Sequence, residues 1–290
     1  MKKAQEKARV LIEALPYIKE YYGKTVVVKF GGNAMENDEL KEMFASDIVL
    51  MRYVGMNPVI VHGGGPQVTF YMERLSLEVR FVDGHRVTDA ATMEVAKMVL
   101  VGKVNKEIVS LINGHGTLAV GLSGEDGNLL RARKRTHFVD GDEVDLGFVG
   151  EVDRVNPGIL NNLIRDEFIP VVASIGVDDA GQSYNINADL VAGALAEALQ
   201  ADKLIYLTDV DGIYRDFEDK SSLIPEMGVA EGEDLIREGG LSSGMLPKMQ
   251  SCMEALRSGV RRAHIINGTI DHALLLELYT DAGIGTMLQA

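Results

Sequence analysis

The 290-residue chain is 46% hydrophobic and 25% charged, which is typical of one large globular domain or of two lobes. Asp and Glu outnumber Lys and Arg by 43 to 29, and the net charge of -14 argues against nucleic-acid binding and against an anionic membrane surface. A single cysteine, Cys252, excludes an intrachain disulfide and a cysteine-rich zinc site. Without a secretory signal or a membrane-span-length apolar run, the sequence predicts a cytoplasmic protein.

The N-terminal segment has apolar residues at helical spacing, from Val10 to Tyr21. This pattern predicts an amphipathic helix over residues 1 to about 22, kinked at Pro16, and we treat 1–24 as a separate N-terminal element. The apolar stripe must pack either against its own domain or against a second subunit. The sequence leaves both possibilities open.

The first expected strand ends in a lysine and two glycines. The run from Thr25 to Phe30 is apolar and β-branched, and it carries Lys29 just ahead of Gly31 and Gly32. This predicts a buried parallel strand whose carboxyl end, where ligands bind in open α/β sheets, presents a lysine and bare backbone N–H groups to an anion. A surface lysine followed by an ordinary glycine turn is the alternative for this stretch.

A second glycine loop follows a helix expected over 38–55. The strand at 59–61 is followed by Gly63, Gly64 and Gly65. Two glycine loops at consecutive strand ends of a βαβ unit predict an anion between them. Neither GxxxxGK[ST] nor a helix-opening GxGxxG occurs, so the sequence does not fit a P-loop enzyme or a dinucleotide fold.

Arg86 lies in a turn-rich segment beside the second glycine loop. The sequence predicts an N-cap at 88 or 89 and a helix that continues to about residue 113. A guanidinium here is a natural bidentate partner for a substrate carboxylate, with a structural ion pair as the alternative. We expect His62 and His85 to be hydrogen-bonding scaffolds rather than metal ligands or general bases.

The second half of the chain repeats the pattern of strand ends with polar side chains. Asn187 is a candidate N-cap for an alanine-rich helix, with Asp189 in its first turn and Asn185 just before it. These residues could also be only a cap and its helper. A strand over 203–208 then leads into an Asp-rich loop, and a glycine and serine loop enters a helix with Lys248 near its start.

Taken together, these motifs resemble those of the amino acid kinase family, in its branch that acts on N-acetyl-L-glutamate in arginine biosynthesis. The resemblance implies a three-layer αβα sandwich around a mainly parallel open sheet, with a substrate lobe at 25–178 and a nucleotide lobe at 179–290. It implies phosphorylation of the γ-carboxylate with ATP, and Mg²⁺ bound through the nucleotide rather than at a separate metal site. The motifs, in order, are VVVKFGG, VIVHGGGP, GHRVTD, NINADLVAGALA, LTDVDGIY and SGMLPKM.

The resemblance also implies roles for individual residues. Lys29 and Lys248 match the lysines that stabilise the transferring phosphoryl group, and Asp189 matches the aspartate that orients them. Four positions match binding groups for the acylated substrate: Gly64, Gly65, Arg86 and Asn185. The nucleotide contacts would be Gly31, Gly32, Thr208, Asp209, Gly212, Tyr214, Gly244 and Lys248.

The C-terminal segment resembles that of family members inhibited by arginine. His264, Glu277 and Gly283 match their arginine site, and in that branch N-terminal helices join three dimers into a ring-shaped hexamer. A nitrogen-regulatory signal protein is a further possible partner. The alternative is a solvated Glu277 and a leading helix that folds onto its own domain.

Three other functions fit parts of the sequence. HGGG, together with a GxSxG string at 240–244 and the downstream His264 or His272, formally permits a serine esterase, although a polar helix-like stretch precedes that serine. A non-catalytic regulator on the same fold would not need both lysines and Asp189. A glutamate or carbamate kinase is the competitor within the family.

Overall fold

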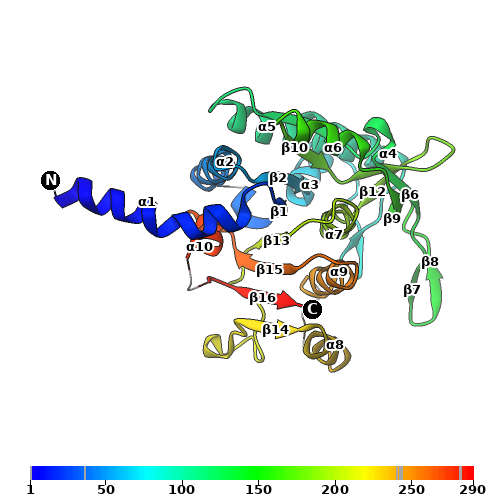
Figure 1. Cartoon of the computed structure of the whole chain (residues 1–290). Coiled ribbons are helices and arrows are strands. Elements are labelled where there is room, and N and C mark those ends of the chain that lie inside the picture. The colour runs from blue at the N-terminus through cyan, green and yellow to red at the C-terminus, as the bar shows by residue number, and fades with distance from the viewer. Residues whose placement is uncertain (1, 36, 240, 242–243, 281–282) are drawn as a thin grey trace.

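The centre of the structure is one eight-stranded sheet (Figure 1). Neighbouring strands in this sheet are parallel, with one exception. The second and third strands, counted from the edge at which the order below begins, are antiparallel. The computed structural model describes residues 2–35, 37–239, 241, 244–280 and 283–290. From one edge to the other the strands are β14 (Glu226–Gly228), β16 (Thr286–Gln289), β15 (Arg262–Asn267), β13 (Lys203–Thr208), β1 (Thr25–Phe30), β2 (Asn57–His62), β10 (Ile169–Ala173) and β5 (Ala119–Ser123).

Helices cover both faces of this sheet, because its central strands are apolar on both. In β1, Val26 and Val28 enter one core, and Val27 enters the other. The predicted three-layer αβα sandwich is therefore confirmed. The first core is completed by α2 (Asp38–Tyr53), α3 (Gly65–Arg74), α4 (Ala90–Lys97), α5 (Asn105–Asn113) and α10 (Ala273–Tyr279), and the second by α6 (Gly158–Arg165), α7 (Ala188–Ala198), α8 (Val229–Arg237) and α9 (Leu246–Arg257).

The register of the central strands brings their carboxyl ends to one edge of the sheet. Phe30 lies opposite His62, which in turn lies opposite Ala173, and Lys29 lies opposite Tyr206. The loops that follow β1, β2 and β13 consequently leave the sheet side by side. Both glycine loops and the Asp-rich loop are placed around a common site by the strand pairing alone.

A small closed barrel and two short ribbons adjoin the main sheet. We predicted that a substrate lobe ends and a nucleotide lobe begins at residue 178. The barrel contains strands from both sides of this residue, and β1 and β13 pair across the same boundary in the main sheet. The two lobes therefore share their sheets, and the boundary at 178 stays a prediction. The barrel consists of β6 (Leu130–Lys134), β9 (Val149–Val155), β11 (Ile175–Val177) and β12 (Ser183–Ile186), and the ribbons are β3 (Phe81–Val82) with β4 (His85–Arg86) and β7 (His137–Val139) with β8 (Asp142–Val144).

The helix predicted from residue 88 to 113 is present but is not α-helical throughout. Asp89 is its N-cap and accepts a hydrogen bond from the N–H of Thr92 at 2.8 Å. Between α4 and α5 the chain forms a π-helix, η2 (Met98–Val104), which hydrophobic spacing does not reveal. Short 3-10 helices are η1 (Gly32–Met35), η3 (Asp126–Asn128) and η4 (Lys220–Ser222).

The N-terminal helix α1 (Lys2–Tyr21) extends away from the rest of the molecule (Figure 1). Only its last turns pack on the domain, where Tyr21 is buried. Val10, Leu11 and Ile12 are 62%, 70% and 69% exposed, so this chain by itself leaves most of the apolar stripe uncovered. None of the helices in the described part of the chain combines the length and apolar character of a membrane span.

Candidate active site

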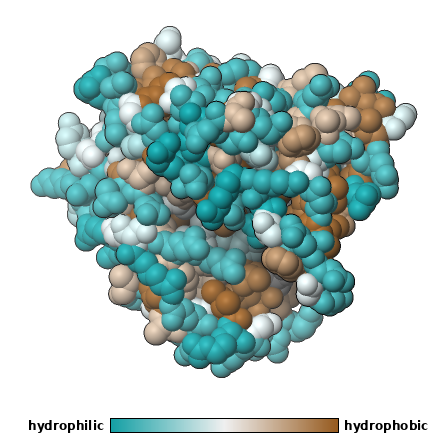
Figure 2. All heavy atoms as spheres, turned by 90° about the vertical axis from the view of Figure 1, so that its right-hand side faces the viewer, coloured by the Kyte–Doolittle hydropathy of each residue, from teal (hydrophilic) through white to brown (hydrophobic). Residues whose placement is uncertain are grey.

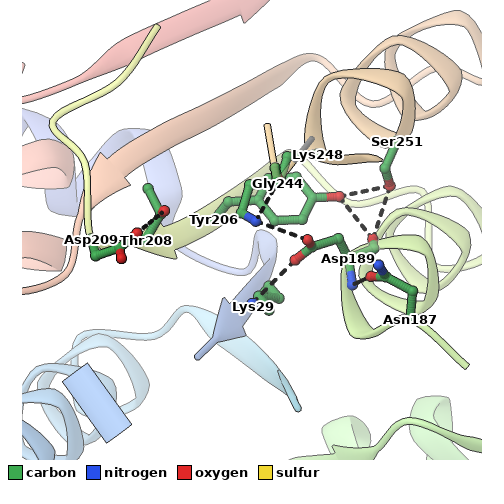
Figure 3. Close-up of polar contacts among 9 residues, drawn as sticks. All are labelled: Lys29, Asn187, Asp189, Tyr206, Thr208, Asp209, Gly244, Lys248 and Ser251. Atoms are coloured by element: carbon green, nitrogen blue, oxygen red, sulfur yellow. Dashed lines mark hydrogen bonds and ion pairs between the residues drawn. The ribbon is translucent and has the colours of Figure 1, made fainter. Parts of the chain in front are cut away.

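Three charged side chains from separate elements meet at the carboxyl end of β1 (Figure 3). Nζ of Lys29 lies 3.1 Å from Oδ1 of Asp189, and Nζ of Lys248 lies 3.0 Å from Oδ2 of the same carboxylate. Lys29 comes from β1, Asp189 from the first turn of α7 and Lys248 from the first turn of α9. The structure brings together the three residues that we predicted to be catalytic.

The charges of this cluster do not balance. Burial raises the pKa of Asp189, but Lys29 and Lys248 outweigh it and hold the pKa of that carboxyl below its usual range. One carboxylate thus bridges two ammonium groups, and one positive charge remains in excess. Because the lysine side chains are only 12% and 14% exposed, this excess is a strong and fixed attraction for an anion.

Asp189 is held through its backbone as well as through the lysines. The Asn187 side chain accepts a hydrogen bond from the Asp189 N–H at 2.7 Å and caps α7. The Tyr206 hydroxyl donates to Oγ of Ser251 at 2.7 Å, and Ser251 donates to the Asp189 carbonyl at 2.9 Å (Figure 3). Ser251 can lie this close to α7 because residue 193 is a glycine. Any larger residue there would place its Cβ 2.1 Å from the Ser251 Oγ. Tyr206 and Ser251 belong to no motif that we recognised in the sequence.

Gly31 leaves space for the Lys29 ammonium group. A Cβ at this position would lie 2.5 Å from Lys29 Nζ. We expect Gly31→Ala to displace the lysine and to lower kcat by roughly a hundredfold, the cost of about an ångström of misplacement at a reacting centre. Steady-state kinetics would measure this, with Gly228→Ala as the control because its added methyl meets open space. Equal kcat values for both variants would contradict the prediction.

A cavity of about 290 Å³ opens beside the lysine pair. Its lining includes both glycine loops and Asp189, and its size suits a small organic acid. At Gly64 the backbone φ is +154°, and a Cβ would lie 2.7 Å from Cδ2 of Leu100, so only glycine fits. The predicted substrate residues Gly64, Gly65, Arg86 and Asn185 all line this cavity.

Arg86 is a buried cation on the wall of the cavity. Its Nη2 donates to the Gly65 carbonyl at 2.9 Å and to Oγ1 of Thr69 at 2.7 Å, and its guanidinium lies 4.7 Å from the centre of the Phe81 ring. Burial lowers its pKa, and no carboxylate in the described part of the chain forms an ion pair with it. A buried guanidinium without a counter-anion fits a ligand carboxylate better than the structural ion pair we had considered. Thr69 and Phe81 were not identifiable from the sequence.

The predicted nucleotide residues Gly32, Thr208 and Asp209 lie in the loops that follow the neighbouring strands β1 and β13 or at their ends. Thr208 and Asp209 lie at the carboxyl end of β13, which pairs with the strand that carries Lys29 (Figure 3). A Cβ at Gly32 would lie 4.0 Å from the backbone nitrogen of Asp209. The glycine loop that follows β1 and the Asp-rich loop that follows β13 are therefore adjacent. The Gly244 carbonyl accepts a hydrogen bond from Lys248 Nζ at 3.1 Å and helps to fix that lysine.

Gly212 and Tyr214 contribute to the shape of the Asp-rich loop. A Cβ at Gly212 would lie 2.5 Å from Oγ1 of Thr286, and Tyr214 donates its hydroxyl to Asp211 at 2.6 Å. That hydrogen bond raises the pKa of Tyr214 to about 12. The Cβ position of Gly212 and the hydroxyl group of Tyr214 thus both contact other groups of the protein. The role of these two residues in nucleotide binding stays a prediction.

His62 is buried and neutral at the end of β2. Its Nδ1 lies 2.8 Å from the Gly63 carbonyl and its Nε2 lies 3.1 Å from Nδ2 of Asn105. Burial lowers the pKa of His62 to about 4. The residue is a hydrogen-bonding scaffold under the second glycine loop.

The His62 pKa predicts a specific loss of stability in acid. Between the ordinary value of 6.5 and the folded value of about 4 the unfolded chain takes up a proton and the folded chain does not. The free energy of unfolding should therefore decrease by up to about 3 kcal/mol over this interval as the pH falls. Urea unfolding at a series of pH values should show a shallower decrease for His62→Leu; identical slopes would contradict the prediction.

The predicted arginine-site residues also lie together, near the end of α1. Glu277 accepts from Nδ1 of His264 at 2.6 Å and from the Ile284 N–H at 2.8 Å, and a Cβ at Gly283 would lie 3.8 Å from Glu277 Oε2. Glu277 is buried rather than solvated, and both of its oxygens have partners. A carboxylate has about four acceptor positions, and these contacts use one on each oxygen.

Lys203 links this cluster to the N-terminal helix. Its Nζ lies 3.0 Å from Nε2 of His264 and 5.0 Å from the centre of the Tyr21 ring in α1. Burial lowers the pKa of Lys203 to about 8. We did not predict Lys203 as part of this cluster, because in the sequence it is only the first residue of a strand.

A larger cavity of about 890 Å³ lies between α7, α9 and β9, on the mostly hydrophilic face that Figure 2 shows. Its charged side chains include mutual ion pairs, Arg133 with Glu151 and Arg257 with Glu233. None of the catalytic or binding residues that we predicted from the sequence lines this larger cavity. The smaller cavity, which is lined by Lys29, Asp189 and both glycine loops, is the better candidate for the active site.

The esterase alternative finds no support in the region that is described. The serine of the GxSxG string, Ser242, lies outside the described residues, as do Gly240 and Ser243. The element before this string is the helix α8, whereas a nucleophile elbow follows a strand.

Comparison with known proteins agrees with this geometry. The model of the amino acid kinase family matches residues 24–267. The chain belongs to the amino acid kinase family. Among its curated relatives in this family, acetylglutamate kinase of Moorella thermoacetica is 56% identical over 287 residues, 98% of this chain and 97% of that protein. The family membership indicated by the six motifs is confirmed.

Solved structures similar to this amino acid kinase include N-acetylglutamate synthase from Neisseria gonorrhoeae. Its complex with coenzyme A and N-acetyl-glutamate gives a TM-score of 0.85 at 28% identity over 98% of this chain. Its complex with coenzyme A and L-arginine gives 0.79 at 27% identity over 97% of this chain. This chain spans 63% and 65% of the length of those two chains.

Proposed function

We propose that this amino acid kinase transfers the γ-phosphoryl group of ATP to the γ-carboxylate of N-acetyl-L-glutamate, a step of arginine biosynthesis. The observation that carries the proposal is a cavity lined both by the Lys29–Asp189 pair and by an uncompensated, buried Arg86. A substrate with two carboxylates suits such a cavity, since one can meet Arg86 while the other meets the phosphoryl group. The similarity to acetylglutamate kinases over nearly the whole chain supports this substrate.

The chemistry needs no general base, because a carboxylate is already ionised near pH 7. One γ-carboxylate oxygen forms the new bond to phosphorus, the bond from phosphorus to the β–γ bridging oxygen breaks, and ADP leaves with that electron pair. Lys29 and Lys248 stabilise the charge on the phosphoryl oxygens, and Asp189 holds both ammonium groups in place. The N–H groups of Gly64 and Gly65, with Asn185, orient the acylated end of the substrate.

ATP would enter with Mg²⁺, which supplies additional charge neutralisation on the phosphates. Mg²⁺ is commonly held by substrate phosphates, water and one or two carboxylates. The donor set fits this mode, because Asp209 is an exposed carboxylate beside Gly32. In the described part of the chain, no group of three or more His, Cys, Asp or Glu side chains is arranged to hold a metal by itself.

The test is a comparison of three acceptors. Purified protein with ATP and Mg²⁺ is assayed for ADP formation with N-acetyl-L-glutamate, L-glutamate and carbamate. We expect kcat/KM for N-acetyl-L-glutamate to exceed the other two by at least about a hundredfold, since a missing acyl group leaves buried polar groups unpaired. A preference for glutamate or carbamate would replace the proposal with the other family activity.

We also propose that the chain forms a hexamer built from three dimers. A closed ring of dimers needs two different contact surfaces. The described chain has two separate exposed apolar surfaces, the stripe Val10–Ile12 on α1 and a patch of Phe70, Leu75 and Met98 beside a cavity of about 600 Å³. A cytoplasmic location and a nitrogen-regulatory signal protein as partner stay predictions.

Arginine is proposed as an inhibitor that binds at His264, Glu277 and Gly283, next to the end of α1. Deleting residues 1–22 should convert hexamers to dimers and reduce arginine inhibition, while kcat without arginine changes by less than about twofold, because the lysine pair lies elsewhere. Light scattering and kinetics with millimolar arginine would measure this. An intact chain that is dimeric and indifferent to arginine would contradict it.

A further inference from the structure

The peptide group between Gly63 and Gly64 is held from one side by His62, whose Nδ1 lies 2.8 Å from the Gly63 carbonyl oxygen. In a trans peptide the C=O and the following N–H point in opposite directions, and no cis peptide bond occurs in the described chain. Fixing the carbonyl toward the protein therefore turns the Gly64 N–H to the other side, where the cavity is. In the described part of the chain this N–H has no acceptor.

Asn105 determines which nitrogen of His62 carries the proton. Its Nδ2 lies 3.1 Å from His62 Nε2 and 2.9 Å from the Val171 carbonyl, and its Oδ1 lies 3.1 Å from Lys106 Nζ. A carbonyl only accepts and an ammonium only donates, so these two neighbours fix the orientation of the amide. His62 Nε2 must then accept, and its proton stays on Nδ1, where it is donated to Gly63.

The pair is built into the core rather than into the cavity. His62 and Asn105 are both fully buried, and neither lines the cavity. Asn105 directly follows the π-helix η2, whose Leu100 packs on Gly64. The Asn105 amide fits here because residue 121 in β5 is a glycine. A Cβ at that position would lie 1.9 Å from Asn105 Oδ1.

We propose that His62 and Asn105 are positioning residues for substrate binding, in which Asn105 holds the His62 proton on Nδ1 and His62 aims the Gly64 N–H at the acylated substrate. The inference rests on the proposed function, which uses this N–H as a donor. A residue that only stabilised the fold would affect both substrates alike. The pair should affect the acid substrate and not the nucleotide.

Two variants of similar size separate these roles. His62→Leu removes the donor to Gly63, whereas His62→Asn keeps an N–H at the position of Nδ1. Titration calorimetry should show N-acetyl-L-glutamate affinity reduced by roughly tenfold in His62→Leu, the value of one hydrogen bond, and within about threefold of wild type in His62→Asn. ATP affinity should be unchanged in both. Equal weakening by the two variants, or an equal loss of ATP affinity, would overturn the proposal.

A second measurement does not depend on variants at the histidine. Nitrogen NMR of protein labelled at histidine should show the Nδ1–H tautomer of His62 in the wild type and a shift toward the other tautomer in Gly121→Ala, which displaces Asn105. A wild-type Nε2–H tautomer would overturn the proposal. A wild type that binds no N-acetyl-L-glutamate would overturn the proposed function, and the tautomer would still be decided by the spectrum.

Discussion

Replacing Lys248 or Lys29 by alanine should lower kcat by two to three orders of magnitude. Each lysine is a fixed donor at the place where phosphoryl charge develops, and loss of one such donor typically costs about 3 to 4 kcal/mol of transition-state stabilisation. The two come from β1 and α9 and converge on Asp189, so neither substitutes for the other. Steady-state kinetics with saturating ATP and N-acetyl-L-glutamate would measure the loss.

The matched control is Lys134→Ala. Lys134 also pairs with an aspartate, Asp145, but its side chain is 54% exposed, and exposed pairs contribute little. Its kcat should stay within about twofold of wild type. If Lys29→Ala or Lys248→Ala retained near wild-type turnover while folded, that lysine would be structural and the proposed mechanism wrong.

Replacing Arg86 by lysine should raise KM for N-acetyl-L-glutamate by at least roughly tenfold and change kcat less. A lysine keeps the charge but cannot reproduce the planar fork that reaches Gly65, Thr69 and a ligand carboxylate together. The KM for ATP should be unaffected. Initial-rate kinetics with each substrate varied in turn would separate the two constants.

Arg74→Lys is the control for this substitution. Arg74 also lies over a phenylalanine ring, that of Phe70, at 5.5 Å, but it is exposed on α3 and does not line the cavity of Arg86. Its KM values should match those of the wild type. An unchanged KM for N-acetyl-L-glutamate in Arg86→Lys would remove Arg86 from the substrate site.

Features that depend on neighbours in the sequence could be predicted. Val26, Val27 and Val28 are apolar in succession, which is typical of a strand covered on both faces, and this strand is central. The cap Asn187, and a second cap at 88 or 89 that the structure places at Asp89, were identifiable because a cap binds N–H groups two or three residues along the chain. The fold and the positions of Lys29, Asp189 and Lys248 followed from such local patterns and from the motifs.

Features that depend on distant partners could not be predicted. Tyr206 and Ser251 support Asp189 from β13 and α9, yet in the sequence each is an ordinary residue of a strand or a helix. Lys203 bonds His264 across neighbouring strands for the same reason. The π-helix η2 was also missed, because one widened turn changes hydrophobic spacing too little to be recognised.

The position of β16 has a consequence for the order in which the chain folds. β16 lies between β14 and β15, and β14 pairs with no strand of the described chain other than β16. In the sequence, α8, α9, β15 and α10 all come between β14 and β16. During synthesis on the ribosome, β14 and its buried Met227 must therefore wait for a late segment, and this edge of the sheet assembles after the helices that separate the two strands.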